Sequence, residues 1–175
     1  MGNISKQKWY VAGLRMGSDG TSDLEIANTL SHKKDDLDIY NNSWGIGFFK
    51  AVLPSTQYTL EQGITEGRQG KGNVFVFAGG NNGNNDGNVN YNPVANSRHT
   101  VAVGAVNDSG NQASYSEPGA PLFVSAPSSD GSNSNNIRTT GLYKDDGDNS
   151  NDYIPFGGTS ASAPQVSGVV ALMLE

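Results

Sequence analysis

Apolar and polar positions along the chain form two alternating patterns. Short, mostly apolar runs predict β-strands at residues 10–15, 37–40, 73–78, 99–106 and 122–125. Helical spacing of apolar residues predicts α-helices at residues 22–33, 55–68 and 162–174. Strands that alternate with helices indicate an α/β fold with a doubly wound, mostly parallel sheet.

Local signals predict where several of these elements begin. Thr21 or Ser22 is expected to cap the first helix, and Glu25 is placed to form a capping box with Ser22. Residues 74–78 are apolar without interruption, as in a strand that is covered on both faces of a parallel sheet. The last helix is expected to begin at Ser162, which places Pro164 in its first turn, where proline is tolerated.

Composition adds long loops to this picture and excludes several functions. Asn and Gly dominate residues 79–97, and Ser, Asn and Asp dominate residues 128–156. The 175 residues carry a net charge of −6 without a basic cluster, which argues against nucleic-acid binding. No apolar run could span a membrane, and the N-terminus lacks the apolar core of a signal peptide. The absence of cysteine excludes disulfides and thiolate chemistry.

The first candidate for chemistry is Ser160, in a Gly-Gly-Thr-Ser-Ala-Ser-Ala-Pro stretch that opens an apolar helix. Free backbone N–H groups at a helix N-terminus can hold a developing oxyanion beside an attacking hydroxyl. Taken alone, the same stretch is better explained by a capped helix whose small residues pack tightly.

Two further candidates follow predicted strands. Asn81 comes directly after the most apolar strand, and ligand sites of α/β sheets lie beyond the carboxyl ends of strands. Its amide could donate a hydrogen bond, although a turn asparagine is the plainer interpretation. Ser43, Trp44 and Gly45 follow the strand at residues 37–40 and could pair with an extended peptide, whereas Trp44 alone could be a core aromatic.

Together and in this order, the motifs resemble the subtilase family of serine peptidases, and within it the kexin and furin-like proprotein convertases. Residues 38–45, 67–78, 115–117 and 158–164 carry this resemblance, which extends from about residue 11 to residue 175. It implies that residues 1–175 form a partial peptidase domain, the C-terminal half of a subtilisin-like catalytic domain. It also implies a polypeptide substrate and a secreted or extracellular location.

The resemblance also implies a role for individual residues. Ser160 corresponds to the nucleophile that forms an acyl-enzyme, and Asn81 to the side-chain donor of the oxyanion hole. Ser43, Trp44 and Gly45 correspond to the segment that pairs with the substrate. The pocket for the residue before the scissile bond corresponds to Ala78, Gly79, Gly80 and Asn92.

The family's Asp and His motifs, which precede this stretch, are not found in the sequence. The chain has two histidines, and neither His32, near the end of a predicted helix, nor His99, at the start of a strand, is expected to act as the base. We therefore expect the chain alone to be inactive and to need the N-terminal half of the domain as a partner. Alone, it should expose a sheet edge and apolar helix faces, and it should fold poorly or self-associate.

A second departure concerns charge around the site. The acidic run that convertases carry after Ser-Trp-Gly is replaced at residues 46–50, and Asn92 stands where an acidic pocket residue is expected. A preference for paired basic residues is therefore not expected. Glu117 and Asp86 remain as candidate ligands for a structural calcium ion. The acidic residues 145–152 lack the spacing of an EF-hand loop and are expected to form a solvated turn.

The sequence leaves two alternatives to this function. One is a non-catalytic peptide-binding module, a subtilase remnant that keeps the cleft without the chemistry. The other is an α/β-hydrolase, whose Gly-x-Ser-x-Gly elbow should surround the nucleophile. Here Ser160 is flanked as Gly-Thr-Ser-Ala-Ser and no histidine follows it, which argues against that fold.

Overall fold

The computed structural model describes residues 11–13, 22–46, 53–129, 137–141 and 153–175. The strand predicted at residues 10–15 lies outside them apart from residues 11–13, which have no regular secondary structure. The helices are α1 (Asp23–Ser31), α2 (Pro54–Gly70) and α3 (Thr159–Met173), with 3-10 turns η1 (Gly83–Asn85) and η2 (Val89–Tyr91). The strands are β1 (Ile39–Asn42), β2 (Val74–Ala78), β3 (Val101–Val106), β4 (Leu122–Pro127), β5 (Ile137–Thr140) and β6 (Tyr153–Phe156).

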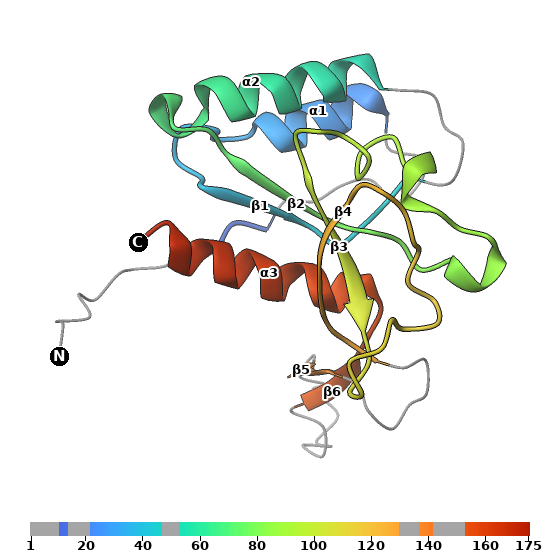
Figure 1. Ribbon diagram of the computed structural model, residues 1–175. Coiled ribbons are helices and arrows are strands. Elements are labelled where there is room, and N and C mark those ends of the chain that lie inside the picture. The colour runs from blue at the N-terminus through green and yellow to red at the C-terminus, as the bar shows by residue number, and fades with distance from the viewer. Residues whose placement is uncertain (1–10, 14–21, 47–52, 130–136, 142–152) are drawn as a thin grey trace, which may run out of the picture.

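A four-stranded sheet in the order β1-β2-β3-β4 forms the centre of the fold, and its neighbouring strands are all parallel. Helices α1 and α2 lie on one face of this sheet and α3 lies on the other (Figure 1). The predicted α/β class with helices on both faces is therefore confirmed. Because the strands are parallel, their carboxyl ends meet at one edge, where the first turn of α3 also lies.

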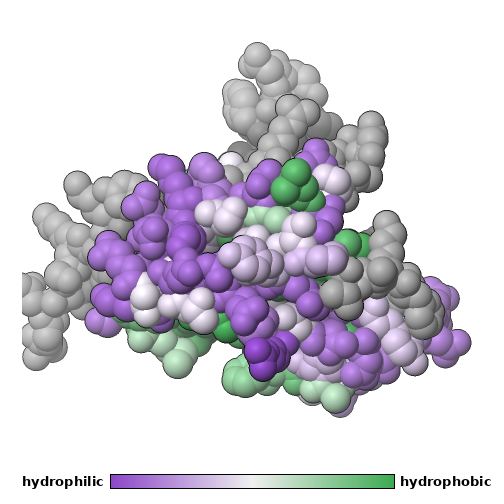
Figure 2. Space-filling view, turned by 90° about the horizontal axis from the view of Figure 1, so that it is seen from above, coloured by the Kyte–Doolittle hydropathy of each residue, from purple (hydrophilic) through white to green (hydrophobic). Residues whose placement is uncertain are grey.

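The core has one part on each side of the sheet, because β2 alternates its side chains between them. Phe75 and Phe77 pack toward α1 and α2, while Val76 and Ala78 pack on the α3 side. All four are buried, as predicted for this apolar run. The outer face over α1 and α2 is mostly hydrophilic, as befits the solvent side of this layer (Figure 2). Small residues such as Ala163 let α3 approach the sheet closely.

Helices α1 and α2 are joined at their N-termini. The capping box between Ser22 and Glu25 is present as predicted. Asp23, the first residue of α1, accepts hydrogen bonds at 2.8 Å from the backbone N–H groups of Ser55 and Thr56. Burial works to raise the pKa of Asp23, but the Thr56 hydroxyl and the backbone N–H groups outweigh it and hold the pKa below the ordinary value of 3.8.

Replacing Asp23 with alanine should lower the free energy of unfolding by about 1 kcal/mol, the typical loss for a helix cap. A depressed carboxylate pKa stabilises the fold above the unfolded-state pKa, and that contribution disappears as the pH falls through the folded-state value. Melting temperatures measured from pH 7 to pH 2 should therefore fall more steeply below about pH 4 in the parent chain than in Asp23→Ala. The exposed Asp36→Ala is the control and should behave like the parent. Parallel pH profiles for the parent and Asp23→Ala would contradict the assignment.

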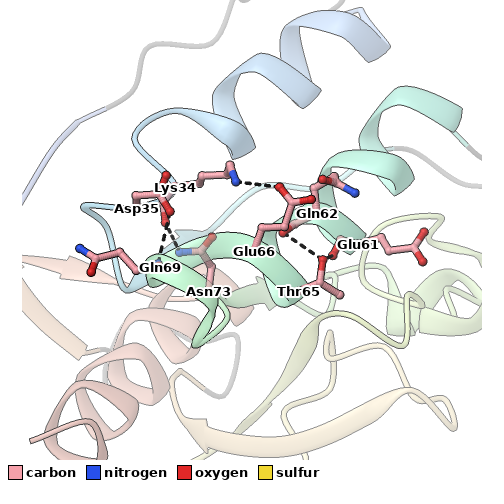
Figure 3. A network of polar contacts seen from close by, with 8 residues as sticks. All are labelled: Lys34, Asp35, Glu61, Gln62, Thr65, Glu66, Gln69 and Asn73. Atoms are coloured by element: carbon pink, nitrogen blue, oxygen red, sulfur yellow. Dashed lines mark hydrogen bonds and ion pairs between the residues drawn. The ribbon is translucent and has the colours of Figure 1, made fainter.

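The other end of α2 is tied to the loop that leads into β1 (Figure 3). The Asn73 amide donates to the carbonyl oxygens of Lys34 and Leu37, at 2.8 and 2.6 Å. Lys34 in turn pairs with Glu66 at 2.9 Å. A side chain on Gly67 would overlap the Asn73 amide, so glycine is needed at this close approach. These contacts of Asn73 and Lys34 hold the start of β1 against the C-terminal end of α2.

Three predictions about elements were wrong in detail. Strand β1 covers Ile39–Asn42 rather than residues 37–40, because it pairs with β2 over Val74 to Phe77. Helix α3 begins at Thr159 rather than Ser162, so Pro164 lies inside the helix and not in its first turn. The antiparallel pair β5–β6 lies in a segment that was expected to be loop, since its short β-forming runs are embedded in polar sequence.

Candidate active site

The first turn of α3 is held at the carboxyl edge of the sheet by Asn81, which follows β2. Gly158 precedes the helix with φ +79°, a conformation that favours glycine. The backbone N–H of Thr159 then donates to Asn81 Oδ1 at 2.8 Å. The Asn81 side chain, although distant in sequence, thus caps α3, and this contact places Asn81 next to Ser160.

The orientation of the Asn81 amide is set by its hydrogen bonds. Its Oδ1 also accepts from the Thr159 hydroxyl at 2.9 Å, and that hydroxyl accepts from the Gly80 N–H at 3.1 Å. Because Oδ1 has two donors, the opposite group, Nδ2, is directed away from Thr159. Among the described residues no hydrogen bond engages Asn81 Nδ2 or the Ser160 backbone N–H. These two free donors are the groups that an oxyanion would need.

Ser160 itself is the second residue of α3 and is partly buried. Its hydroxyl donates to the carbonyl oxygen of Ser43 at 3.1 Å. In return, the Ser43 hydroxyl donates to the carbonyl oxygen of Ser160 at 2.9 Å. The segment after β1 and the first turn of α3 are therefore joined directly, although 117 positions separate the two residues.

A pocket of about 250 Å³ opens beside Ser160 and gathers most of the residues predicted from the sequence. It is lined by Trp44, Gly45, Ile46, Ala78, Gly80, Asn81, Asn82, Asn92, Glu117, Thr159 and Ser160. Gly79, expected in the pocket wall, does not line it. Its N–H donates to Val103, and a side chain there would point at Val103 and Leu122. Ser43 touches Ser160 without lining the pocket.

Polar groups deep in the pocket have defined partners. Asn92 Oδ1 accepts from two backbone N–H groups, so its Nδ2 lies toward Gly45. Glu117 is only 4% exposed, and one carboxylate oxygen accepts from the Asn82 backbone N–H at 3.2 Å. Gly80 makes room for Glu117, because a side chain at position 80 would overlap the carboxylate. The pocket wall is therefore acidic on one side and carries an amide donor, Asn92 Nδ2, on another.

Calcium binding at Glu117 and Asp86 stays a prediction. Asp86 is exposed at the end of η1 and does not line the pocket. Within the described ranges, no group of three or more acidic, histidine or cysteine side chains is placed to hold a metal ion. These residues alone do not make up the oxygen-rich ligand set that calcium prefers.

Both histidines of the chain lie far from Ser160 in the fold. His32 ends α1, on the face of the sheet opposite α3. His99 precedes β3 and therefore lies toward the amino edge of the sheet, where its Nε2 accepts from Arg98. Neither lines the pocket. The expectation that neither histidine serves as the base of Ser160 agrees with this placement.

Thr159 and Asn82 are site residues that were not predicted from the sequence. Thr159 orients Asn81, and Asn82 binds Glu117. The position of Thr159 directly before a candidate nucleophile was the available signal, but its hydrogen-bond partner cannot be inferred from local sequence. Asn82 lies in a run of asparagines and could not be told from its neighbours.

Comparison with known proteins agrees with this geometry. The model of the subtilase family, Peptidase_S8, matches residues 2–175. The chain therefore belongs to the subtilase family, whose members are serine endopeptidases.

Similar curated proteins include proprotein convertase subtilisin/kexin type 4 of Mus musculus, 35% identical over 169 residues, which covers 94% of this chain and 25% of that protein. Endoprotease aex-5 of Caenorhabditis elegans is 33% identical over 164 residues, covering 91% and 28%. The chain thus spans about a quarter of the length of these relatives.

Solved structures show the same fold. A lanthipeptide protease matches with a TM-score of 0.71 at 23% identity, covering 90% of this chain and 53% of that one. A cold-adapted subtilisin-like serine proteinase matches with a TM-score of 0.64 at 22% identity, covering 90% and 50%. In the part of the chain that the structure describes, no helix has both the length and the apolar character needed to cross a bilayer.

Proposed function

We propose that this chain carries the nucleophile and the oxyanion hole of a serine endopeptidase that cleaves polypeptides. The observation that carries the proposal is the position of Ser160 at the start of α3, beside the free donors Asn81 Nδ2 and Ser160 N–H. The Ser160 hydroxyl adds to the scissile carbonyl carbon while a base takes its proton. The two donors hold the resulting oxyanion. The amine leaves with that proton, and water then releases the acyl group from Ser160.

The substrate is proposed to bind as an extended strand along Ser43, Trp44 and Gly45, which continue from the edge strand β1. An incoming backbone N–H would take the Ser43 carbonyl that the Ser160 hydroxyl now occupies. The side chain before the scissile bond would enter the pocket between Ala78, Gly80 and Asn92. Binding and chemistry are thus placed side by side.

The base is proposed to come from outside this sequence, because both histidines lie away from Ser160. A serine hydroxyl without a base is a weak nucleophile, so the chain alone should not turn over substrate. The supplier is proposed to be the N-terminal half of a subtilase catalytic domain, and the family resemblance supports a secreted or extracellular location.

The outer face of α3 supports such a partner. Val169, Leu172 and Met173, in the apolar last turns of α3, are 57%, 65% and 76% exposed. Apolar side chains gathered on an exposed surface often mark a site that a partner covers. Among the described residues, one edge of β1 has no partner strand; β1 lies next to α3, and this edge can accept another strand.

A peptide-binding module without catalysis is the second candidate. The observation in its favour is that Ser160 donates its proton to Ser43 instead of to a base. Such a module would bind extended peptides at Ser43 to Gly45 and would leave them intact.

Reaction with a fluorophosphonate probe tests the two candidates. The chain alone should be labelled at Ser160 very slowly, and addition of a subtilase N-terminal half that carries the histidine should raise the rate by several orders of magnitude. The same N-terminal half with its histidine replaced by alanine is the control. Peptide binding without labelling in the assembled pair would favour the binding module. Fast labelling of the isolated chain would contradict the need for an external base.

A further inference from the structure

The backbone carbonyl of Ser160 has lost its ordinary helical partner. In an α-helix each carbonyl accepts from the N–H four residues later, and four residues after Ser160 stands Pro164. Proline has no N–H, and its ring also crowds the carbonyl of the preceding turn. Ser160, which carries the nucleophilic hydroxyl, therefore has a carbonyl oxygen that receives no hydrogen bond from the backbone N–H four residues later.

The Ser43 hydroxyl occupies that place. It donates to the Ser160 carbonyl oxygen at 2.9 Å, across from the segment that follows β1. Asn41 Nδ2 donates to the same Ser43 hydroxyl at 3.1 Å. Because the hydroxyl receives this bond, its own proton is directed to Ser160. Asn41 Oδ1 in turn accepts from Ser167 at 3.0 Å, two turns further along α3.

We propose that Ser43, through its hydroxyl, is the positioning residue for the Ser160 nucleophile and replaces the hydrogen bond that Pro164 removes. This inference rests on the proposed function, since it concerns the placement of the attacking oxygen. A bond to the backbone of Ser160 fixes the first turn of α3 against the substrate-binding segment. The distance between the attacking oxygen and the scissile carbon is therefore set by the same residue whose carbonyl faces the substrate.

The test uses the chain assembled with a histidine-bearing N-terminal half, with fluorophosphonate labelling and peptide hydrolysis as readouts. Loss of one hydrogen bond that positions the reacting group should lower the labelling rate and kcat of Ser43→Ala roughly 3- to 10-fold, with KM nearly unchanged. Ser43→Thr keeps the hydroxyl and should restore the rate. If Ser43→Ala does not fold, Ser43→Cys keeps the volume with only a weak donor and should show the loss.

Pro164→Ala provides the decisive comparison. Alanine returns an N–H to position 164, which can bind the Ser160 carbonyl. Ser43→Ala should then cost less in the Pro164→Ala background than in the parent, and this coupling is a signature that a merely structural role of Ser43 would not give. Ser162→Ala is the matched control, because its hydroxyl also binds a backbone carbonyl, that of Ala126 at 3.0 Å, away from Ser160. It should lower the melting temperature and leave kcat near the parent value.

The outcomes separate the two proposals. If the assembled parent is not labelled at all, the proposed function itself is wrong. If the parent is labelled and Ser43→Ala reacts within twofold of it, the positioning role is overturned while the proposed function stands. An equal loss for Ser43→Ala in both backgrounds would likewise overturn the link to Pro164.

Discussion

Ser160→Ala is expected to abolish peptide hydrolysis in the chain assembled with a histidine-bearing N-terminal half. The expected fall in kcat is on the order of 10⁶-fold, the loss that removal of the nucleophile causes in a subtilisin. Among the described residues the Ser160 hydroxyl bonds only to the Ser43 carbonyl, so its removal should leave the fold intact. Hydrolysis of a chromogenic peptide measures the loss, and a peptide-binding titration should give an unchanged Kd.

The control for this variant is Ser162→Ala, in the same helix. It should retain most of the activity, since its hydroxyl binds the carbonyl of Ala126 and does not line the pocket. Residual hydrolysis by Ser160→Ala above a thousandth of the parent rate would mean that another group performs the chemistry. The assignment of Ser160 as nucleophile would then fail.

Asn81→Ala is expected to give the second-largest effect. Removal of one oxyanion donor costs roughly 10²- to 10³-fold in kcat in a subtilisin, because the donor acts on charge that develops only in the transition state. KM should change little for the same reason. Steady-state kinetics of the assembled enzyme separates the two parameters.

Asn81 also caps α3, and the loss of that cap could itself disturb the site. Asn81→Asp separates the two roles. It keeps an oxygen for the Thr159 N–H and hydroxyl, so the melting temperature should stay near that of the parent. It lacks the N–H donor and adds a negative charge, so kcat should fall at least as far as in Asn81→Ala. Near-normal turnover of Asn81→Asp would show that Asn81 matters only as a cap.

The order of strands and helices could be predicted from the local pattern of apolar residues, but the exact ends of several elements could not. The apolar run of β2 predicted a strand covered on both faces, because such a strand has no solvent-facing side on which polar residues would alternate. The start of α3 was misplaced because Asn81, 78 positions earlier, caps Thr159, and helix propensity carries no information about such a partner. The register of β1 was likewise decided by its pairing with β2.

The candidate site could be predicted only because several motifs together resembled a family, since each residue type alone had a plainer structural interpretation. Ser160, Asn81 and Trp44, which follow strands or open a helix, line one pocket, and Asn92, expected from the resemblance alone, lines it too. Gly79 was misassigned because the sequence does not tell which way a loop residue faces. The reciprocal bonds between Ser43 and Ser160 could not be foreseen, since they depend on a relative position that only tertiary packing sets.

The separation of 117 positions between Ser43 and Ser160 has a consequence for folding during synthesis on the ribosome. Asn81 lies between them in sequence, so no shorter stretch of nascent chain contains all three groups. Contacts of such long range form late, after the sheet has been completed and α3 has docked on it. Reactivity of Ser160 toward a probe would therefore report complete folding. A nascent or partly folded chain would lack the assembled site and could not cleave other polypeptides.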